Sequence, residues 1–267
     1  MQHDLIAAAV QMNSGEDKAD NWAAAERLVR RAVAEGAQLV VLPEYFNCLG
    51  DRRTMLAEAE SLAGPTAEKL SAWAGELQIT LVGGTFCEAR PGMAKAFNTS
   101  LTFDPSGKLT ATYRKRHLFD VELPNLTYRE SDWLAPGDEI VNCRAGEIRL
   151  APAVCYDLRF PEMFRHFADE NIDVVALPAA FTKTTGAAHW ELLIRARAVE
   201  NQCFIVAANQ TGRHATLETF GHSLIVDPWG DVVADAGEGE GVIAVRLEAQ
   251  RLRDVRARLP ALRHRRR

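Results

Sequence analysis

Two pairs of segments in this 267-residue chain repeat each other, and this repeat restricts the possible folds more than any other feature. Residues 97–107, FNTSLTFDPSG, align with residues 220–230, FGHSLIVDPWG. Residues 40–46, VVLPEYF, match residues 174–181, VVALPAAF, with one extra residue. The chain is therefore predicted to contain two related halves. Because Asp-Pro followed by Gly favours a tight turn between antiparallel strands, each half is expected to supply αβ crossovers and then a hairpin.

Strand and helix patterns alternate along the chain, which predicts an α/β protein. Two sheets packed face to face with helices outside would bury both sets of strands. No linker rich in Pro, Gly or Ser divides the chain, so one domain over residues 1–267 is expected, with 249–267 as a C-terminal helix and basic tail. The expected strands are 4–12, 38–44, 79–87, 100–104, 109–114, 147–155, 173–180, 204–210, 223–228 and 241–248, and the expected helices lie near 20–35, 66–76, 161–170 and 189–203.

The candidate nucleophile is Cys155, which ends an apolar run in LAPAVCYDLRFPE (150–162), just before a proline-led helix start. A thiol at the end of a buried strand is held rigidly, while its sulfur faces loops that substrates can reach. The alternative is a buried structural cysteine, the usual state of a free thiol. This segment alone leaves both interpretations open.

Two other segments supply a carboxylate and an ammonium group. AQLVVLPEYF (37–46) is a second apolar strand that contains Glu44 at its end, and TATYRKRHLFD (110–120) places Lys115 in a basic cluster. A thiol, a carboxylate and an ammonium group suffice for amide hydrolysis without a metal, because one attacks, one moves protons and one stabilises the oxyanion. Alternatively, Glu44 could cap a helix and Lys115 could be a solvated surface charge.

LPEYF, YRKRHLFD and CYDLRFPE resemble the Glu, Lys and Cys motifs of the nitrilase superfamily of carbon-nitrogen hydrolases, in the same order and at ordinary spacings. The similarity covers residues 4–250. Within the superfamily, residues 181–214 and 220–230 resemble the branch of deaminated-glutathione amidase and ω-amidase, and the TGxxHW and RARAxExQ strings are nearest the former. The resemblance implies a four-layer α-β-β-α sandwich with internal pseudo-duplication. It also implies a homodimer or higher homo-oligomer, whose interface includes helices of the 189–203 region.

In the expected mechanism, Glu44 accepts the proton of Cys155 and the thiolate attacks the amide carbon. Lys115 and backbone N–H groups near Tyr156 stabilise the oxyanion, Glu44 protonates the departing ammonia, and water activated by Glu44 hydrolyses the thioester. Glu130 matches the family's additional glutamate and is expected to hold Lys115 or the substrate amide. A surface loop charge is the alternative for Glu130.

The repeat differs at one chemically important position. The strand that ends in Leu-Pro-Glu in the first half ends in Leu-Pro-Ala in the second, so Ala179 stands where a second Glu44 would be. Only one half can supply the base. A single active site per chain is therefore expected.

The residues around Cys155 suggest the class of substrate. Tyr156-Asp157 follows Cys155 where true nitrilases usually have Trp-Glu, which favours amides over nitriles. Arg159 is placed to bind a substrate carboxylate through two hydrogen bonds, with an ion pair to Asp157 or Glu162 as the alternative. The other residues expected to contact substrate are Tyr156, Phe181, Thr182 and Thr185.

Together these features predict a thiol-dependent amidase that acts on a small carboxylate-bearing amide, as deaminated-glutathione amidase does, and releases ammonia and an acid. The alternative within the enzyme class is an ω-amidase acting on α-ketoglutaramate or α-ketosuccinamate. The alternative outside it is a catalytically silent relative that serves in binding or assembly.

Metal and cofactor chemistry is not indicated. The seven histidines form no HExxH and no zinc-ligand spacing, and neither GxGxxG nor a P-loop is present, so no metal and no cofactor are expected. His117 could pair with Cys155 as in thiol proteases. The adjacent Leu118 and Phe119 instead favour a packed histidine that orients the loop.

Charge and cysteine content restrict partners and location. The net charge of −5 gives no general attraction to nucleic acids or acidic membranes, so neither is an expected partner. The arginines from residue 251 onward favour a solvated helix and tail, with a nucleic-acid or anionic-lipid arm as the weaker alternative. An odd number of cysteines without a CxxC pair, and no apparent signal peptide or membrane span, predict a cytoplasmic protein with reduced thiols.

Overall fold

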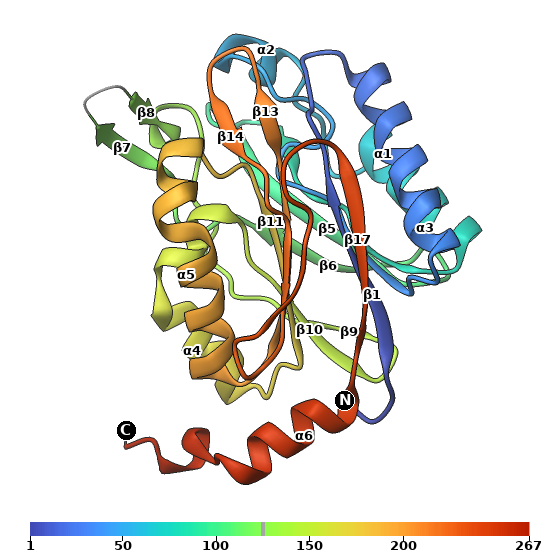
Figure 1. The fold of residues 1–267 in the computed structure, drawn as a ribbon. Coiled ribbons are helices and arrows are strands. Elements are labelled where there is room, and N and C mark those ends of the chain that lie inside the picture. Colours follow the sequence, from blue (N-terminus) through green and yellow to red (C-terminus); the bar gives the residue numbers. More distant parts are fainter. Residues whose placement is uncertain (124–125, 267) are drawn as a thin grey trace.

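The computed structural model describes residues 1–123 and 126–266, and it contains two mixed sheets that lie face to face with helices on both outer faces (Figure 1). Helices α1 (Lys18–Ala34) and α3 (Pro65–Leu77) cover one face, and α4 (Pro161–Asp169) and α5 (Lys183–Asn201) cover the other. The prediction of a four-layer α-β-β-α sandwich is confirmed.

Within the described residues, the first sheet has the order β17-β1-β2-β3-β5-β4, with β6 also paired to β5. The second sheet has the order β16-β15-β12-β11-β10-β9. The strands of the first sheet are β1 (Leu5–Gln11), β2 (Leu39–Val41), β3 (Thr80–Val82), β4 (Phe86–Glu88), β5 (Phe97–Phe103), β6 (Leu109–Arg114) and β17 (Gly241–Leu247). Those of the second are β9 (Cys143–Ala145), β10 (Ile148–Pro152), β11 (Val174–Ala179), β12 (Phe204–Asn209), β15 (Leu224–Val226) and β16 (Val232–Asp235).

The two sheets contain the two halves of the sequence repeat. Parallel strands β1, β2 and β3 correspond to parallel strands β10, β11 and β12, and each set continues into an antiparallel hairpin. The Asp104 carboxylate at the β5–β6 turn accepts hydrogen bonds from the backbone N–H groups of Ser106 and Lys108. The Asp227 carboxylate at the β15–β16 turn accepts equivalent bonds two and four residues later. The predicted Asp-Pro hairpins are therefore present in both halves.

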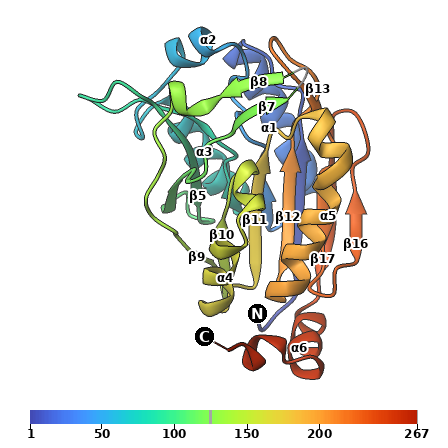
Figure 2. The ribbon, with the colours of Figure 1, turned by 90° about the vertical axis from the view of Figure 1, so that its left-hand side faces the viewer.

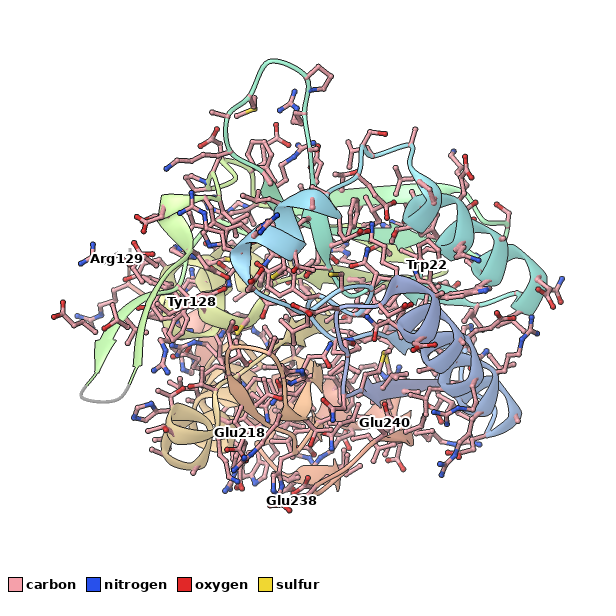
Figure 3. The ribbon with its side chains drawn as sticks, turned by 90° about the horizontal axis from the view of Figure 1, so that it is seen from above. Trp22, Tyr128, Arg129, Glu218, Glu238 and Glu240 are labelled. Atoms are coloured by element: carbon pink, nitrogen blue, oxygen red, sulfur yellow. The ribbon has the colours of Figure 1, made fainter. Side chains whose placement is uncertain are left out.

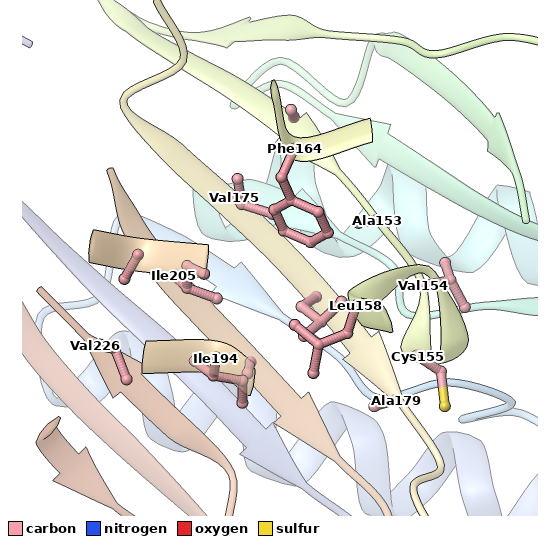
Figure 4. Packing of buried hydrophobic residues seen from close by; sticks show 14 of the residues in the cluster. Ala153, Val154, Cys155, Leu158, Phe164, Val175, Ala179, Ile194, Ile205 and Val226 are labelled. Atoms are coloured by element: carbon pink, nitrogen blue, oxygen red, sulfur yellow. The ribbon is translucent and has the colours of Figure 1, made fainter. Parts of the chain in front are cut away.

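Because side chains along each strand point alternately to its two faces, three apolar layers form. In β1, Ala7 and Ala9 pack between the two sheets, whereas Ala8 and Val10 pack under α1 and α3. Figure 4 shows the third layer, in which residues of the second sheet such as Ile205 pack against α4 and α5. Since side chains on a strand point alternately to opposite faces, a strand covered on both faces is apolar throughout.

Several sequence predictions were wrong in detail. Helix α5 begins at Lys183, six residues before the expected start at 189, because the glycine in TKTTG is part of the helix. Gly186 lies so close to Phe220 that an added Cβ would be 2.4 Å from the Phe220 Cβ. The expected strand 79–87 is two strands, separated at Gly84. This glycine has φ +56° and lies against the Pro43 carbonyl, where a Cβ would be 2.1 Å away.

The short elements were not predicted. They carry no long apolar period, and they form because tertiary contacts hold them. They are α2 (Arg52–Ala57), the hairpin of β7 (Asp120–Leu123) and β8 (Leu126–Arg129), the hairpin of β13 (Thr211–Arg213) and β14 (Glu218–Phe220), and strands β9 and β16.

The C-terminal segment forms α6 (Ala249–Arg258) and the 3-10 helix η3 (Ala261–His264), which lie at the opposite end of the sandwich from the β7–β8 hairpin (Figure 2). Three of its arginines form ion pairs with acidic residues elsewhere in the chain: Arg251 with Asp227, Arg256 with Asp173 and Arg265 with Asp169. The last residue of the expected tail, 267, lies outside the described residues. None of the described helices is long and apolar enough to cross a membrane.

Candidate active site

The candidate site lies where the carboxyl ends of the central parallel strands of both sheets meet. The backbone N–H of Glu44, just after β2, donates to the Ala179 carbonyl at the end of β11, with an N–O distance of 3.4 Å. The ends of the two equivalent strands are thus in contact across the sheets. Figure 3 looks down on this end, with Tyr128 of β8 and Glu218 of β14 labelled. Ligands commonly bind at the carboxyl ends of parallel strands.

Cys155 occupies a sharp turn between strand β10 and helix α4. Strand β10 ends at Pro152, and the chain then forms the 3-10 turn η2 (Cys155–Arg159) before α4 begins at Pro161. The φ of Cys155 is +45°, a left-handed conformation that residues other than glycine rarely adopt. Figure 4 shows the Cys155 sulfur beside Ala179 at the end of β11. The surroundings therefore hold the thiol in one orientation.

Glu44 is held at both ends. Its carbonyl accepts a hydrogen bond from Gln210 Nε2 at 2.9 Å. In the side chain, Oε1 accepts from Asn98 Nδ2 at 2.7 Å and from Lys115 Nζ at 3.0 Å, while Oε2 accepts from the Ala180 backbone N–H at 2.8 Å. No helix begins at this residue. The capping role that the sequence left open is therefore wrong.

Lys115 is completely buried and directly follows β6, so it is not a solvated surface charge. Its ammonium group lies between two carboxylates, 3.0 Å from Glu44 Oε1 and 2.8 Å from Glu130 Oε2. Glu130 begins the 3-10 turn η1 (Glu130–Asp132) and is also buried. Its carboxylate accepts further hydrogen bonds from the Phe119 backbone N–H and the Tyr45 hydroxyl. Glu130 therefore holds the ammonium group and is not a surface loop charge.

Burial and neighbouring charges both shift the pKa values of these groups, and the two effects partly oppose each other. Burial raises the pKa of the Cys155 thiol well above its usual value; Glu44 also raises it, and Lys115 lowers it. Burial lowers the pKa of Lys115, but Glu130 and Glu44 outweigh it and raise this pKa well above its usual value. Burial raises the pKa of Glu130 despite the opposing charge of Lys115. These directions favour a neutral thiol beside an ammonium group, an arrangement in which a base would activate the sulfur.

Two adjoining pockets meet at Cys155 and share Phe119, Ala180 and Thr182. The inner pocket contains Glu44, Lys115, Glu130 and Cys155 together. The outer pocket contains all five residues that the sequence proposed for substrate contact: Tyr156, Arg159, Phe181, Thr182 and Thr185.

The Arg159 guanidinium is available to a ligand in the outer pocket. Its central carbon lies 5.2 Å from the centre of the Phe181 ring and 5.7 Å from that of Tyr156, and one nitrogen lies 3.3 Å from His189 Nδ1. In the described part of the chain, Arg159 forms no ion pair with Asp157 or Glu162. The alternative interpretation of Arg159 is therefore wrong.

Several residues of the site were not predicted from the sequence. Asn98 could have been recognised as the amide that stands in the first copy of the repeat where the second copy has Gly221. The other missed residues lie in loops or short elements that were not predicted, and no sequence pattern indicated their place in the site. The additional inner-pocket residues are Tyr45, Leu49, Tyr128 and Leu217.

His117 does not form the thiol-protease pair that was the weaker alternative. Its Nδ1 lies 2.7 Å from Asp157 Oδ1, and its ring stacks on Phe160 with centroids 3.7 Å apart. Across the described ranges, no hydrogen bond joins His117 to Cys155. The histidine is packed within the loop, as the neighbouring apolar residues suggested.

Comparisons with known proteins agree with this geometry. The sequence pattern of the carbon-nitrogen hydrolase family matches residues 6–257. A deaminated glutathione amidase from Synechocystis is 41% identical over 265 residues, covering 97% of both chains. Human omega-amidase is 38% identical over 261 residues, covering 97% of this chain and 94% of the relative. The crystal structure of Saccharomyces cerevisiae Nit3, a member of branch 10 of the nitrilase superfamily, superposes with a TM-score of 0.89 at 34% identity, covering 97% of this chain and 95% of that one.

The chain belongs to the carbon-nitrogen hydrolase family, within the nitrilase superfamily. Its similarity to deaminated glutathione amidase and to omega-amidase further identifies it as an amidase. A catalytically silent relative is therefore no longer the alternative to consider.

Proposed function

We propose that the protein hydrolyses the amide bond of a small carboxylate-bearing amide through a thioester on Cys155. The observation that carries this proposal is the inner pocket, where the thiol, the Glu44 carboxylate and the Lys115 ammonium group lie together with Glu130. These groups provide a nucleophile, a base and a cation, so the reaction requires no metal or cofactor.

In the first half of the reaction, Glu44 accepts the Cys155 proton as the sulfur attacks the amide carbon. The oxyanion forms beside Lys115, with backbone N–H groups near Tyr156 as further donors. Because the ammonium group is fixed between two carboxylates, it does not need to reorganise as this charge develops. Glu44 then returns the proton to the departing nitrogen, and the C–N bond breaks.

In the second half, water replaces the departed amine. Glu44 accepts a proton from this water, which attacks the thioester carbon, and the acid is released as the sulfur takes a proton back. Glu130 keeps Lys115 in position and does not accept the substrate proton. Its hydrogen bonds to Lys115, Phe119 and Tyr45 already occupy its carboxylate.

We propose that Arg159 provides the carboxylate specificity. Its guanidinium lies beside Cys155 in the outer pocket, with Thr182 and Thr185 as nearby hydroxyl groups. A guanidinium can bind a carboxylate through two parallel hydrogen bonds, and a partly enclosed pocket strengthens this contact. Substrates should therefore be dicarboxylic compounds with one carboxyl group present as an amide.

Replacing Arg159 by methionine should reduce kcat/KM for acidic amides by about ten- to a hundredfold, because one charge-assisted contact is worth roughly 1.5 to 3 kcal/mol. Rates for neutral amides such as propionamide should change much less. Steady-state kinetics on both classes measure the difference. Arg165→Met is the matched control, since Arg165 lies on α4 and pairs with Glu200. Equal loss for acidic and neutral amides would refute the carboxylate role.

We favour deaminated glutathione as substrate and keep α-ketoglutaramate or α-ketosuccinamate as the alternative. The two relatives described above support these two choices with similar identities. In deaminated glutathione the amide nitrogen belongs to a dipeptide, so the leaving group is that amine and not the ammonia expected from the sequence, whereas the ω-amides release ammonia. A direct assay of the dicarboxylic acid product is therefore needed. Higher kcat/KM for α-ketoglutaramate would favour the ω-amidase activity.

The protein is also proposed to work as a cytoplasmic homodimer or higher homo-oligomer. Helix α5 exposes two apolar side chains, Leu192 and Val199, which are 67% and 45% exposed in the single chain. These two residues are seven positions apart and therefore lie on the same face of the helix, and an exposed apolar face of this kind can be covered by another chain. Light scattering after gel filtration should give a multiple of the 29.5 kDa chain mass. A mass of one chain at micromolar concentration would contradict this.

A further inference from the structure

Asp157 lies two residues after Cys155 and is completely buried. Its carboxylate accepts four hydrogen bonds. Oδ2 accepts from the Tyr113 hydroxyl at 2.6 Å and from the Val154 backbone N–H at 2.9 Å. Oδ1 accepts from the His117 backbone N–H at 3.1 Å and contacts His117 Nδ1 at 2.7 Å. Nothing in the proposed reaction uses this carboxylate.

The donors to Asp157 flank the two groups that must meet the substrate. Tyr113 and His117 are two residues before and two residues after Lys115. Val154 is the residue directly before Cys155. Asp157 therefore joins the segment that carries the ammonium group to the turn that carries the sulfur. Within the described residues, no other residue of the turn η2 forms a side-chain hydrogen bond with the Lys115 segment.

We propose that Asp157 is a positioning residue that fixes the Lys115 ammonium group relative to the Cys155 sulfur. This inference rests on the proposed function for its catalytic consequence, whereas the geometry itself does not depend on the substrate. An ionised carboxylate suits this position because it only accepts hydrogen bonds, and all four groups around it can donate. The left-handed backbone of Cys155 also requires surrounding contacts to hold it, and the bond from Val154 is one of them.

Asparagine is the informative replacement at this position. It has nearly the same shape, but one of its two side-chain groups is an NH₂ donor. The hydroxyl of Tyr113 and the ring of His117 can each adjust to a donor, whereas the backbone N–H groups of Val154 and His117 cannot. In either orientation of the amide, one backbone N–H loses its acceptor, so one of the two segments is released.

Asp157→Asn should reduce kcat by about ten- to a hundredfold, because an error of about 1 Å in the placement of reacting groups has an effect of this size. KM should change by less than about threefold, because Asp157 does not line the substrate pockets. Asp173→Asn is the matched control. Asp173 is also buried and accepts a backbone hydrogen bond, from Arg149, at the opposite end of β11. This control should leave kcat unchanged.

A second measurement separates positioning from general loss of structure. Alkylation of Cys155 by iodoacetamide, followed by intact-mass analysis, requires no substrate. Asp157→Asn should slow this alkylation about tenfold in the otherwise native protein, but less than about twofold when added to Lys115→Met, because two changes that act through one contact are not additive. Equal effects in both backgrounds would overturn the proposal.

Tyr113→Phe removes only one of the four hydrogen bonds and tests the same idea if Asp157→Asn does not fold. It should give a smaller loss of kcat, and its effect should again be weaker when it is combined with Lys115→Met. An unchanged kcat would count against the proposal. The two proposals also fail in distinguishable ways. If the protein hydrolyses none of the amides but the alkylation results hold, the proposed function is wrong and the positioning role of Asp157 stands.

Discussion

Replacing Cys155 by alanine should abolish amide hydrolysis while the protein still folds. Loss of a catalytic nucleophile typically reduces kcat by about 10⁴- to 10⁶-fold. The substitution removes one buried sulfur and leaves the hydrogen bond from Val154 to Asp157 in place. The free energy of unfolding should therefore change by about 1 kcal/mol, which corresponds to a change in Tm of roughly 2 to 4 °C for a domain of this size. Product release and thermal unfolding measure the two effects.

Cys143→Ala provides the control for this experiment. Cys143 lies in β9 at the edge of the second sheet and does not line either pocket. This variant should keep full activity. Activity remaining in Cys155→Ala, above the level of a contaminating amidase, would show that a different group attacks the amide.

Glu44→Gln and Lys115→Met should each reduce kcat/KM by orders of magnitude. Glutamine keeps the shape of Glu44 but cannot accept a proton, which should reduce the rate by about 10²- to 10⁴-fold. Methionine removes the cation beside the oxyanion, which should reduce it by about 10²- to 10³-fold. A reduction of less than about tenfold in either variant would remove that residue from the proposed mechanism.

Lys115→Met should also destabilise the protein, because it leaves Glu44 and Glu130 buried without their cation. Breaking a buried pair by removing one partner costs about 3 to 5 kcal/mol. Adding Glu130→Gln removes one of the two carboxylates and should restore part of this stability without restoring activity. Recovery of activity in the double variant would argue that the charge of Lys115 is not needed for the reaction.

The sequence predicted the positions that depend on long periodic segments. The central strands of both sheets were expected from continuous apolar runs. Glu44 and Cys155 were expected because each ends such a run, and Lys115 was expected because it follows a strand-like alternation in a basic cluster. Pairing of the repeated halves then explains why Glu44 meets Ala179 at the end of the equivalent strand. A strand end is visible in a sequence, so groups placed at strand ends are predictable.

Contacts between segments distant in sequence were not predictable in the same way. Asp157 was considered only as a motif position and as an ion-pair partner for Arg159, whereas it binds Tyr113 and His117. These residues are 44 and 40 positions away in sequence. The lining of the inner pocket by Leu49, Tyr128 and Leu217 depends on loops and short hairpins that have no period to read. Such contacts follow from the packing of the whole sandwich and are not a local property.

The formation of a thioester on Cys155 is the central claim, and intact-mass analysis of protein quenched with acid during turnover tests it most directly. The mass should increase by that of the acyl group of the substrate, peptide mapping should place the increase on Cys155, and Cys155→Ala should show none. An adduct on another residue, or a pre-steady-state burst of the departing ammonia or amine with no acyl adduct on Cys155, would contradict the proposed mechanism.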